Sequence, residues 1–187
     1  MASAAVDSSF DVAFWFLDRA LDEQEYLQPQ KMHRLMYLAQ AYFAVAYNGR
    51  MLMPAIFVAE EFGPIEPNVF RACAIQRPAI DAKRLPEAVD HFLDSIWRKF
   101  GPHSSEFLNK QVAGHAPVRD ALAKGTRTEI PLAAMIAFYG KKATVGSESM
   151  AAPAPVNQVL RPKLMRSQTG KAVEVRKWMP PTKSKTS

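Results

Sequence analysis

The chain has 187 residues, which is enough for one domain with a tail and too few for two full domains. Hydrophobic residues make up 48% of the sequence, so a core can be buried and global disorder is excluded. The net charge of +6 is unevenly distributed: residues 141–187 carry ten Lys and Arg against two Glu, a net +8, and residues 1–140 carry −2. The sequence therefore predicts an acidic domain followed by a basic tail.

The single cysteine, Cys73, excludes an internal disulfide and a cysteine-based zinc or iron–sulfur site. The N-terminal residues have neither the basic nor the apolar segment of a secretory signal. Charged residues interrupt every apolar stretch before it reaches the ~18 residues that a membrane span requires. We therefore expect a cytoplasmic protein that has no membrane partner.

The first two predicted helices begin and end at typical capping residues. Ser8 can cap a helix whose apolar residues recur at helical spacing as far as Leu21. Pro29 suits the first turn of a second helix, and Asn48-Gly49 can end that helix in a left-handed conformation. Apolar side chains cover most sides of the second helix, so we expect it in the middle of the domain.

The segment after the second helix contains a predicted corner. Residues 51–62 fit either a short strand or an extended packed segment. Gly63-Pro64 and Pro67 then predict a rigid change of direction, because glycine permits a tight approach and each proline fixes φ. Further helices are expected at residues 68–75, 86–100, 104–112 and 117–123 and after Thr128. The predicted fold class is mainly α: a compact bundle of about six helices with one short irregular β-like segment and a disordered C-terminal tail.

The sequence divides into three predicted regions. Residues 1–9 are predicted to be a flexible N-terminus and residues 10–140 a helical domain. Residues 141–187 are predicted to be a basic, mostly disordered tail, because the helical periodicity stops there and Gly, Pro, Ser, Thr, Ala and Lys dominate. Within this tail, the alternation of residues 172–179 predicts a strand that forms on a partner.

No group of side chains in the sequence predicts catalysis or metal binding. The histidines share no helix face with another histidine or a carboxylate at ligand spacing: His33, His91, His103 and His115. Cys73 lies in a short apolar helix and is expected to be a packed thiol. The sequence contains no phosphate-binding glycine loop and no Gly-x-Ser-x-Gly motif. We therefore expect no enzymatic activity, no cofactor and no metal ion.

Two segments taken together resemble the Panacea domain, a family of antitoxin-like proteins. The first segment, M-H-R-L-M-Y-L-A-Q-A-Y-F at residues 32–43, resembles the family pattern K-L-L-Y-Y-A-Q through Arg34, Leu35, Tyr37, Gln40 and Tyr42. The second, F-V-A-E-E-F-G-P-I-E-P-N-V-F at residues 57–70, resembles A-W-K-Y-G-P-V-V-P-x-V-Y through Phe62, Gly63, Pro64, Pro67 and Phe70. The resemblance covers residues 10–140 and implies that these positions form the structural motif of a helical domain.

Three glutamates depart from the family pattern. Glu60 and Glu61 stand where the family usually has an aromatic and a basic residue, and Glu66 replaces a small apolar residue. If this strip faces the partner, the partner's surface is more basic than is usual for the family. Solvated side chains without a partner are the competing interpretation. The candidate partner-binding residues are Glu60, Glu61, Phe62 and Glu66 at the corner and Arg176, Lys177 and Trp178 in the tail.

The resemblance implies binding rather than catalysis, because antitoxins of this family neutralise a cognate toxin protein. In its size and its tail the chain is similar to the SocA type, which implies a proteolytic adaptor that delivers the toxin to the ClpXP protease. A flexible tail suits this role, since a second weak contact raises the effective concentration of the first. The alternative is a nucleic-acid-binding accessory protein whose basic tail contacts phosphates.

Overall fold

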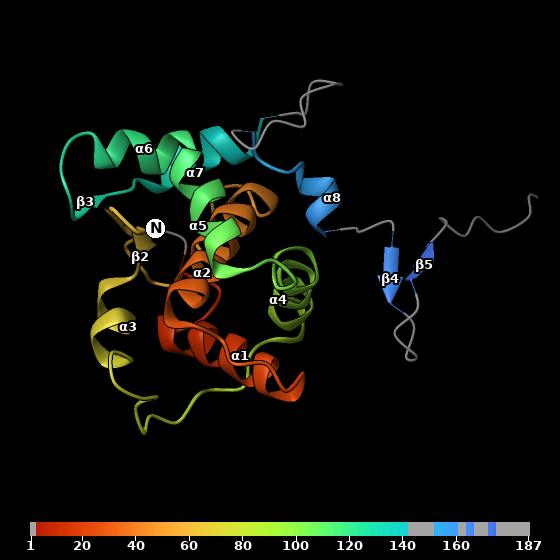
Figure 1. Ribbon diagram of the computed structural model, residues 1–187. Helices are drawn as coiled ribbons and strands as arrows, with labels where there is room; N and C mark the ends of the chain where they lie inside the picture. Colours follow the sequence, from red (N-terminus) through yellow and green to blue (C-terminus); the bar gives the residue numbers. More distant parts are fainter. Residues whose placement is uncertain (1–2, 142–151, 161–163, 167–171, 175–187) are drawn as a thin grey trace, which may run out of the picture.

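The computed structural model describes residues 3–141 and 152–160, together with the backbone of residues 164–166 and 172–174. These residues form a mainly α structure with a small three-stranded sheet, as Figure 1 shows, and the predicted fold class is confirmed. The helices are α1 (Ser9–Asp22), α2 (Pro29–Ala46), α3 (Pro67–Ala72), α4 (Glu87–Phe100), α5 (Ser105–Gly114), α6 (Ala116–Leu122), α7 (Leu132–Tyr139) and α8 (Val156–Leu160). The strands are β1 (Val58–Glu60), β2 (Gly63–Ile65), β3 (Thr128–Glu129), β4 (Leu164–Arg166) and β5 (Ala172–Glu174). Within the described part of the chain, no helix combines the length and the apolar character that crossing a membrane requires.

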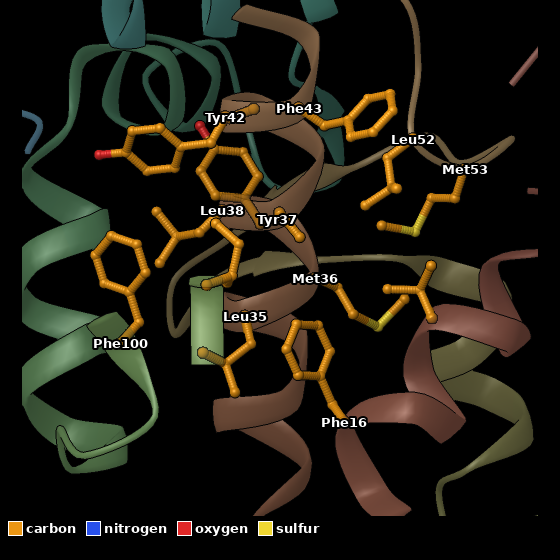
Figure 2. Close-up of a cluster of buried hydrophobic side chains, with 14 of the residues drawn as sticks. Phe16, Leu35, Met36, Tyr37, Leu38, Tyr42, Phe43, Leu52, Met53 and Phe100 are labelled. Carbon is orange, nitrogen blue, oxygen red and sulfur yellow. The ribbon is translucent and has the colours of Figure 1, made fainter. Parts of the chain in front are cut away.

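Helix α2 lies at the centre of the domain. Every residue from Lys31 to Ala44 is buried, and α1, α4, α5, α7 and strand β2 all pack against this helix. Figure 2 shows side chains leaving α2 on several sides, with Phe16 of α1, Phe100 of α4 and Leu52 and Met53 of the following loop around them. The prediction that this helix occupies the middle of the domain is confirmed.

The ends of α1 and α2 follow the capping residues of the sequence. Ser8 Oγ accepts a hydrogen bond from the Phe10 backbone N–H at 3.1 Å, which caps α1. Asn48 and Gly49 adopt positive φ angles of 52° and 85° shortly after the end of α2. Local chemistry thus sets both helix ends where the sequence predicts them.

The predicted corner is a β-hairpin. Strand β1 pairs antiparallel with β2, with Glu60 opposite Gly63, and the turn Glu61-Phe62 joins the two strands. Strand β3, much later in the chain, pairs with the other edge of β1 and gives the order β2-β1-β3. The strand interpretation of residues 51–62 therefore holds for their last part, and the hairpin makes the change of direction.

The folded unit includes part of the N-terminus. The backbone N–H groups of Ala5 and Val6 donate hydrogen bonds to the carbonyl oxygens of Met51 and Leu52, each at 3.0 Å. The Val6 side chain is also buried. The prediction that residues 1–9 are flexible is wrong for these two positions, because backbone pairing with a distant loop leaves no mark in the local sequence.

The folded unit also extends past residue 140. Helix α8 packs against α2 and α4, and its Val159 side chain is fully buried. On α2, the Tyr42 hydroxyl donates a hydrogen bond to the Ala154 carbonyl oxygen at 2.8 Å. Residues 152–160 therefore belong to the domain, which corrects the predicted start of the tail. Their few apolar residues stand too close to prolines to predict a helix from the sequence.

The rest of the predicted tail is described only in part. Strand β5 lies in the segment that is predicted to form a strand on a partner, but it pairs antiparallel with β4 of the same chain. In this pairing, Met165 stands opposite Val173. The candidate residues Arg176, Lys177 and Trp178 lie outside the described residues.

Removal of α8 is expected to destabilise the domain. A chain that ends at Lys141 loses the buried Val159 side chain and the carbonyl partner of Tyr42. We expect its free energy of unfolding to fall by about 2–4 kcal/mol. A chain that ends at Leu160 keeps both contacts and should unfold in urea like the full chain. Equal urea midpoints for the two truncated chains would contradict the packing of α8.

Candidate protein-binding site

The Arg34 guanidinium joins the two segments on which the family resemblance depends. The Arg34 side chain is fully buried. Its Nη1 donates to the Pro64 carbonyl oxygen at 2.7 Å, its Nη2 to the Phe62 carbonyl oxygen, and its Nε to Asn109 Oδ1 at 2.7 Å. One side chain of α2 thus ties the β1–β2 hairpin and helix α5 to the centre of the domain.

The Arg34 charge is stabilised by dipoles and not by a carboxylate. Among the described residues, none of the ion pairs involves Arg34. Burial lowers the pKa of Arg34 to about 10, so the guanidinium stays protonated at neutral pH. Two backbone carbonyl groups and the Asn109 side-chain amide offset the cost of burying this charge.

Gly63 is required where Arg34 approaches the hairpin. Its φ angle of 110° lies in a region that favours glycine. A Cβ atom at this position would lie 2.7 Å from Arg34 Nε and 2.8 Å from Arg34 Cζ. The glycine therefore meets two requirements, a positive φ and room for the guanidinium, and the predicted tight approach is confirmed.

His33 holds the start of α3 from the neighbouring position on α2. The Glu66 backbone N–H donates a hydrogen bond to His33 Nδ1 at 3.3 Å. Burial, with a smaller contribution from the Arg34 charge, lowers the pKa of His33 to about 4. The imidazole is therefore neutral at physiological pH, and its Nδ1 acts as a hydrogen-bond acceptor.

Glu66 caps a helix and does not lie at the surface. Its carboxylate accepts hydrogen bonds from the Val69 backbone N–H at 2.6 Å and from Asn68 Nδ2 at 3.1 Å, in the first turn of α3. Only 1% of Glu66 is exposed. The prediction that Glu66 contacts a partner is wrong, because the N–H groups at the helix start bind its carboxylate inside the domain.

The other two glutamates do not form a common acidic strip. Glu60 is at the end of β1, where its carboxylate lies 3.5 Å from Arg127 Nε and its side chain is 16% exposed. Glu61 is exposed in the hairpin turn. Glu60 belongs to β1 and Glu61 to the turn that follows it, so the two carboxylates have different surroundings. Of the predicted acidic residues, Glu61 is the one that is open to a partner.

Two phenylalanines are exposed at the corner, and we call them the Phe62–Phe70 patch. Phe62 and Phe70 are 39% and 40% exposed, and their rings stack with centroids 6.1 Å apart. Arg34 Cζ lies 6.0 Å from the Phe62 ring centroid, and the His33 ring centroid lies 5.8 Å from that of Phe70. The sequence predicts a contact role for Phe62 and a structural one for Phe70. The Panacea pattern that the sequence resembles has an aromatic residue at both positions. This shared aromatic character is the sequence feature from which a common role of Phe62 and Phe70 could have been predicted.

The remaining motif residues have structural contacts. Gln40 Oε1 accepts hydrogen bonds from the backbone N–H groups of Leu52 and Met53 at 3.0 and 3.1 Å. This side chain therefore fixes the loop that follows α2. The others lie in the buried core or in the first turn of α3: Leu35, Tyr37, Tyr42 and Pro67.

The histidines and the cysteine of the described residues are packed side chains rather than members of a reactive group. Within them, no three His, Cys, Asp or Glu side chains lie close enough to hold a metal ion. His115 Nδ1 is 2.8 Å from the Tyr139 hydroxyl in the core, and the His103 ring stacks on Phe107. Burial raises the pKa of the half-buried Cys73 thiol, which lowers its reactivity at neutral pH. The corner instead has an exposed apolar surface, the Phe62–Phe70 patch, on a backbone that hydrogen bonds hold in place.

Comparison with known proteins identifies no relative of the chain. No protein-family model matches the sequence, no curated protein matches it, and no solved structure matches it. The function therefore has to be inferred from the residues of the chain and their geometry.

Gly63→Ala is expected to lower the free energy of unfolding by ~3 kcal/mol, because a Cβ is strained at this φ and displaces the Arg34 guanidinium. Gly114→Ala is the matched control, since a Cβ at Gly114 meets no atom within 4 Å. The control should be neutral or slightly stabilising. Urea unfolding compares the two variants, and equal stabilities would show that Arg34 does not constrain residue 63.

The stability of the domain is expected to fall between pH 6.5 and about 4, in part through His33. In this range the imidazole binds a proton in the unfolded chain but not in the folded domain, so protonation favours unfolding. His33→Asn keeps an acceptor for the Glu66 N–H and removes the titration. The variant should therefore lose less stability over this range, by up to about 3 kcal/mol. Unfolding free energies at several pH values measure the difference; parallel profiles would contradict the prediction.

Proposed function

We propose that the chain is an antitoxin that binds and neutralises a cognate toxin protein through the Phe62–Phe70 patch. The observation that carries this proposal is the exposure of two stacked aromatic rings at a corner that is held from inside the domain. Aromatic side chains are enriched at protein interfaces, and a few such residues supply most of the binding energy. The patch thus has the chemistry of a protein-binding surface.

The support behind the patch favours tight binding. Phe62 lies in a turn whose carbonyl group accepts a hydrogen bond from Arg34. Phe70 lies on α3, whose start is held by the Glu66 carboxylate and by His33. The backbone at both phenylalanines is therefore fixed before a partner binds, which reduces the entropy lost on association.

Glu61 adds a charged residue to the edge of the patch. It is exposed in the same turn as Phe62, whereas Glu60 is paired with Arg127. A toxin that fits this surface presents an apolar pocket for the two rings and a Lys or Arg beside it. Charges at the edge of an interface act mainly on the association rate and its salt dependence.

The resemblance to the Panacea domain supports the same surface, since its two motifs meet at Arg34, next to Phe62. We extend the proposal to the SocA-type function, in which the chain is a proteolytic adaptor that delivers the bound toxin to ClpXP. The domain holds the toxin in this proposal, and residues after Leu160 provide the second contact. The candidate residues of that contact are Arg176, Lys177 and Trp178.

Replacing both rings, Phe62→Ser with Phe70→Ser, is expected to abolish neutralisation, because the interface loses its apolar anchors. Tyr26→Ser is the matched control: Tyr26 is 79% exposed and lies between α1 and α2, outside the corner. The measurement is the growth of cells that produce the product of a neighbouring gene, alone and together with each variant. Growth rescue by the double variant would contradict the patch. Neighbouring genes without toxicity would contradict the antitoxin function.

The adaptor function makes a separate prediction about degradation. With purified toxin and ClpXP, the full chain is expected to accelerate degradation of the toxin. A chain that ends at Leu160 should bind the toxin as well as the full chain does but should not accelerate its degradation, because it keeps the corner and lacks the second contact. Equal degradation rates with the two chains would exclude the C-terminal residues from the mechanism.

A further inference from the structure

A groove runs between helices α1 and α4. It consists of two adjoining hollows of about 780 and 450 Å³, which share Trp15, Asp18 and Asp90. Polar contacts join the two helices along the groove: Trp15 Nε1 donates to Asp90 Oδ1 at 2.6 Å, and Arg19 Nη2 lies 3.1 Å from Asp94 Oδ1. These contacts hold the walls of the groove at a fixed separation.

Carboxylates outnumber basic side chains in this groove. Its lining contains six acidic and four basic residues: Asp11, Asp18, Asp22, Glu87, Asp90 and Asp94 against Arg19, Lys83, Arg84 and Arg98. Asp94 pairs with Arg19 and Arg98, and Asp18 pairs with Arg77. Four carboxylates of the lining take part in no ion pair within the described part of the chain: Asp11, Asp22, Glu87 and Asp90. Asp11 accepts a hydrogen bond from the Lys83 backbone N–H, so Asp22, Glu87 and Asp90 are the ones chosen for substitution below.

Trp15 gives the groove a second feature that suits a cationic ligand. Its half-buried indole lines both hollows beside Asp18 and Asp90. The face of an indole ring attracts Lys and Arg side chains, and neighbouring carboxylates accept hydrogen bonds from their N–H groups. Unpaired carboxylates repel an anionic ligand such as a nucleic acid. The groove is therefore suited to a positively charged segment.

We propose that this groove binds the C-terminal segment of the same chain, residues 175–187. The segment contains four basic residues and no Asp or Glu: Arg176, Lys177, Lys183 and Lys185. Its charge is therefore complementary to the unpaired carboxylates of the groove. The segment lies outside the described residues, and its covalent connection to the domain raises its effective concentration at the groove above that of any separate partner.

The chain leaves the domain within reach of the groove. Helix α8 ends at Leu160 and packs against α4, which forms one wall of the groove. Figure 1 shows α8 and α1 on different sides of α4, so the chain has to pass around one helix, a path on the order of 15–20 Å. Glu174 pairs with Leu164, which is four residues after Leu160. With this pairing kept, the connection from Leu160 to residue 175 spans roughly 20 Å, about the length of this path.

Binding in the groove makes the positive charges of the C-terminus less accessible to other partners. The contact is electrostatic and lies at the surface, so it weakens as the salt concentration rises. A partner with a stronger negative charge displaces the segment from the groove. This regulation of the C-terminus does not depend on the proposed toxin and is tested without it.

Paramagnetic relaxation in NMR spectra of the full chain tests the proposal. A nitroxide is attached at Ser184→Cys in a Cys73→Ser background, which leaves one attachment site. At low salt, the Trp15 indole N–H and the backbone amides of Asp18 and Asp90 are expected to lose intensity relative to the chain with the reduced nitroxide. At high salt, the intensity should return. Full intensity of these signals at low salt would overturn the proposal.

Matched substitutions separate charge in the groove from charge elsewhere. The groove variant, which should abolish the loss of intensity, is Asp22→Asn, Glu87→Gln and Asp90→Asn. The control variant, which removes three exposed carboxylates elsewhere and should leave the loss unchanged, is Glu61→Gln, Glu106→Gln and Glu129→Gln. A loss of intensity that persists in the folded groove variant, or that disappears in the control variant, would overturn the proposal.

Two further measurements keep the test decisive. If the groove variant does not fold, neutral substitutions in the segment should abolish the loss instead: Arg176→Gln, Lys177→Gln, Lys183→Gln and Lys185→Gln. A loss that persists after these substitutions would overturn the proposal. A mixture of an isotope-labelled chain without nitroxide and an unlabelled chain with nitroxide should show no loss. A loss in this mixture would show that a second copy occupies the groove and would overturn binding within one chain.

Discussion

A guanidinium that is buried without a carboxylate partner has to be stabilised by dipoles held at fixed positions. Arg34 finds them in the carbonyl groups of Phe62 and Pro64 and in the Asn109 amide, which belong to the β1–β2 hairpin and to α5. These groups reach the guanidinium only when α2, the hairpin and α5 are packed together. Arg34 thus couples three elements that are distant in the sequence, because a partly formed structure leaves its charge buried without hydrogen bonds.

The same constraint accounts for the residue types around the corner. Gly63 leaves room for the guanidinium. The Glu66 carboxylate caps α3 instead of pairing with Arg34, and the neutral His33 imidazole accepts the Glu66 backbone N–H. The polar interactions of the corner are therefore directed inward. Its outer side keeps the aromatic rings, and the hydrogen bonds beneath them fix the backbone of the Phe62–Phe70 patch, while Arg34 and His33 also contact the inner sides of the two rings.

The core helices and their ends could be predicted because their signals are local: apolar residues recur at helical spacing, and Ser8 and Pro29 mark helix starts. Strand β3 and helix α8 could not be predicted from the sequence, because both depend on contacts with distant parts of the chain. The two residues of β3 pair with β1, and α8 is held by its buried Val159 side chain. The site was predicted in part. The sequence predicts that another part of the chain approaches Gly63 closely, but it does not show that this part is the Arg34 guanidinium. It also shows the charge of Glu66 but not the helix start that buries it.

The Phe62–Phe70 patch is apolar and the groove between α1 and α4 is acidic. Binding to the two surfaces should therefore depend differently on salt concentration. Contact between apolar surfaces acts at short range and depends little on ions at physiological concentration. The carboxylates of the groove act over a screening length of ~8 Å at physiological ionic strength, which shortens as salt rises. The patch lies on the hairpin and α3, and the groove lies between α1 and α4. A rise in ionic strength is therefore expected to release a segment held in the groove by charge, and to leave an apolar contact at the patch nearly unchanged.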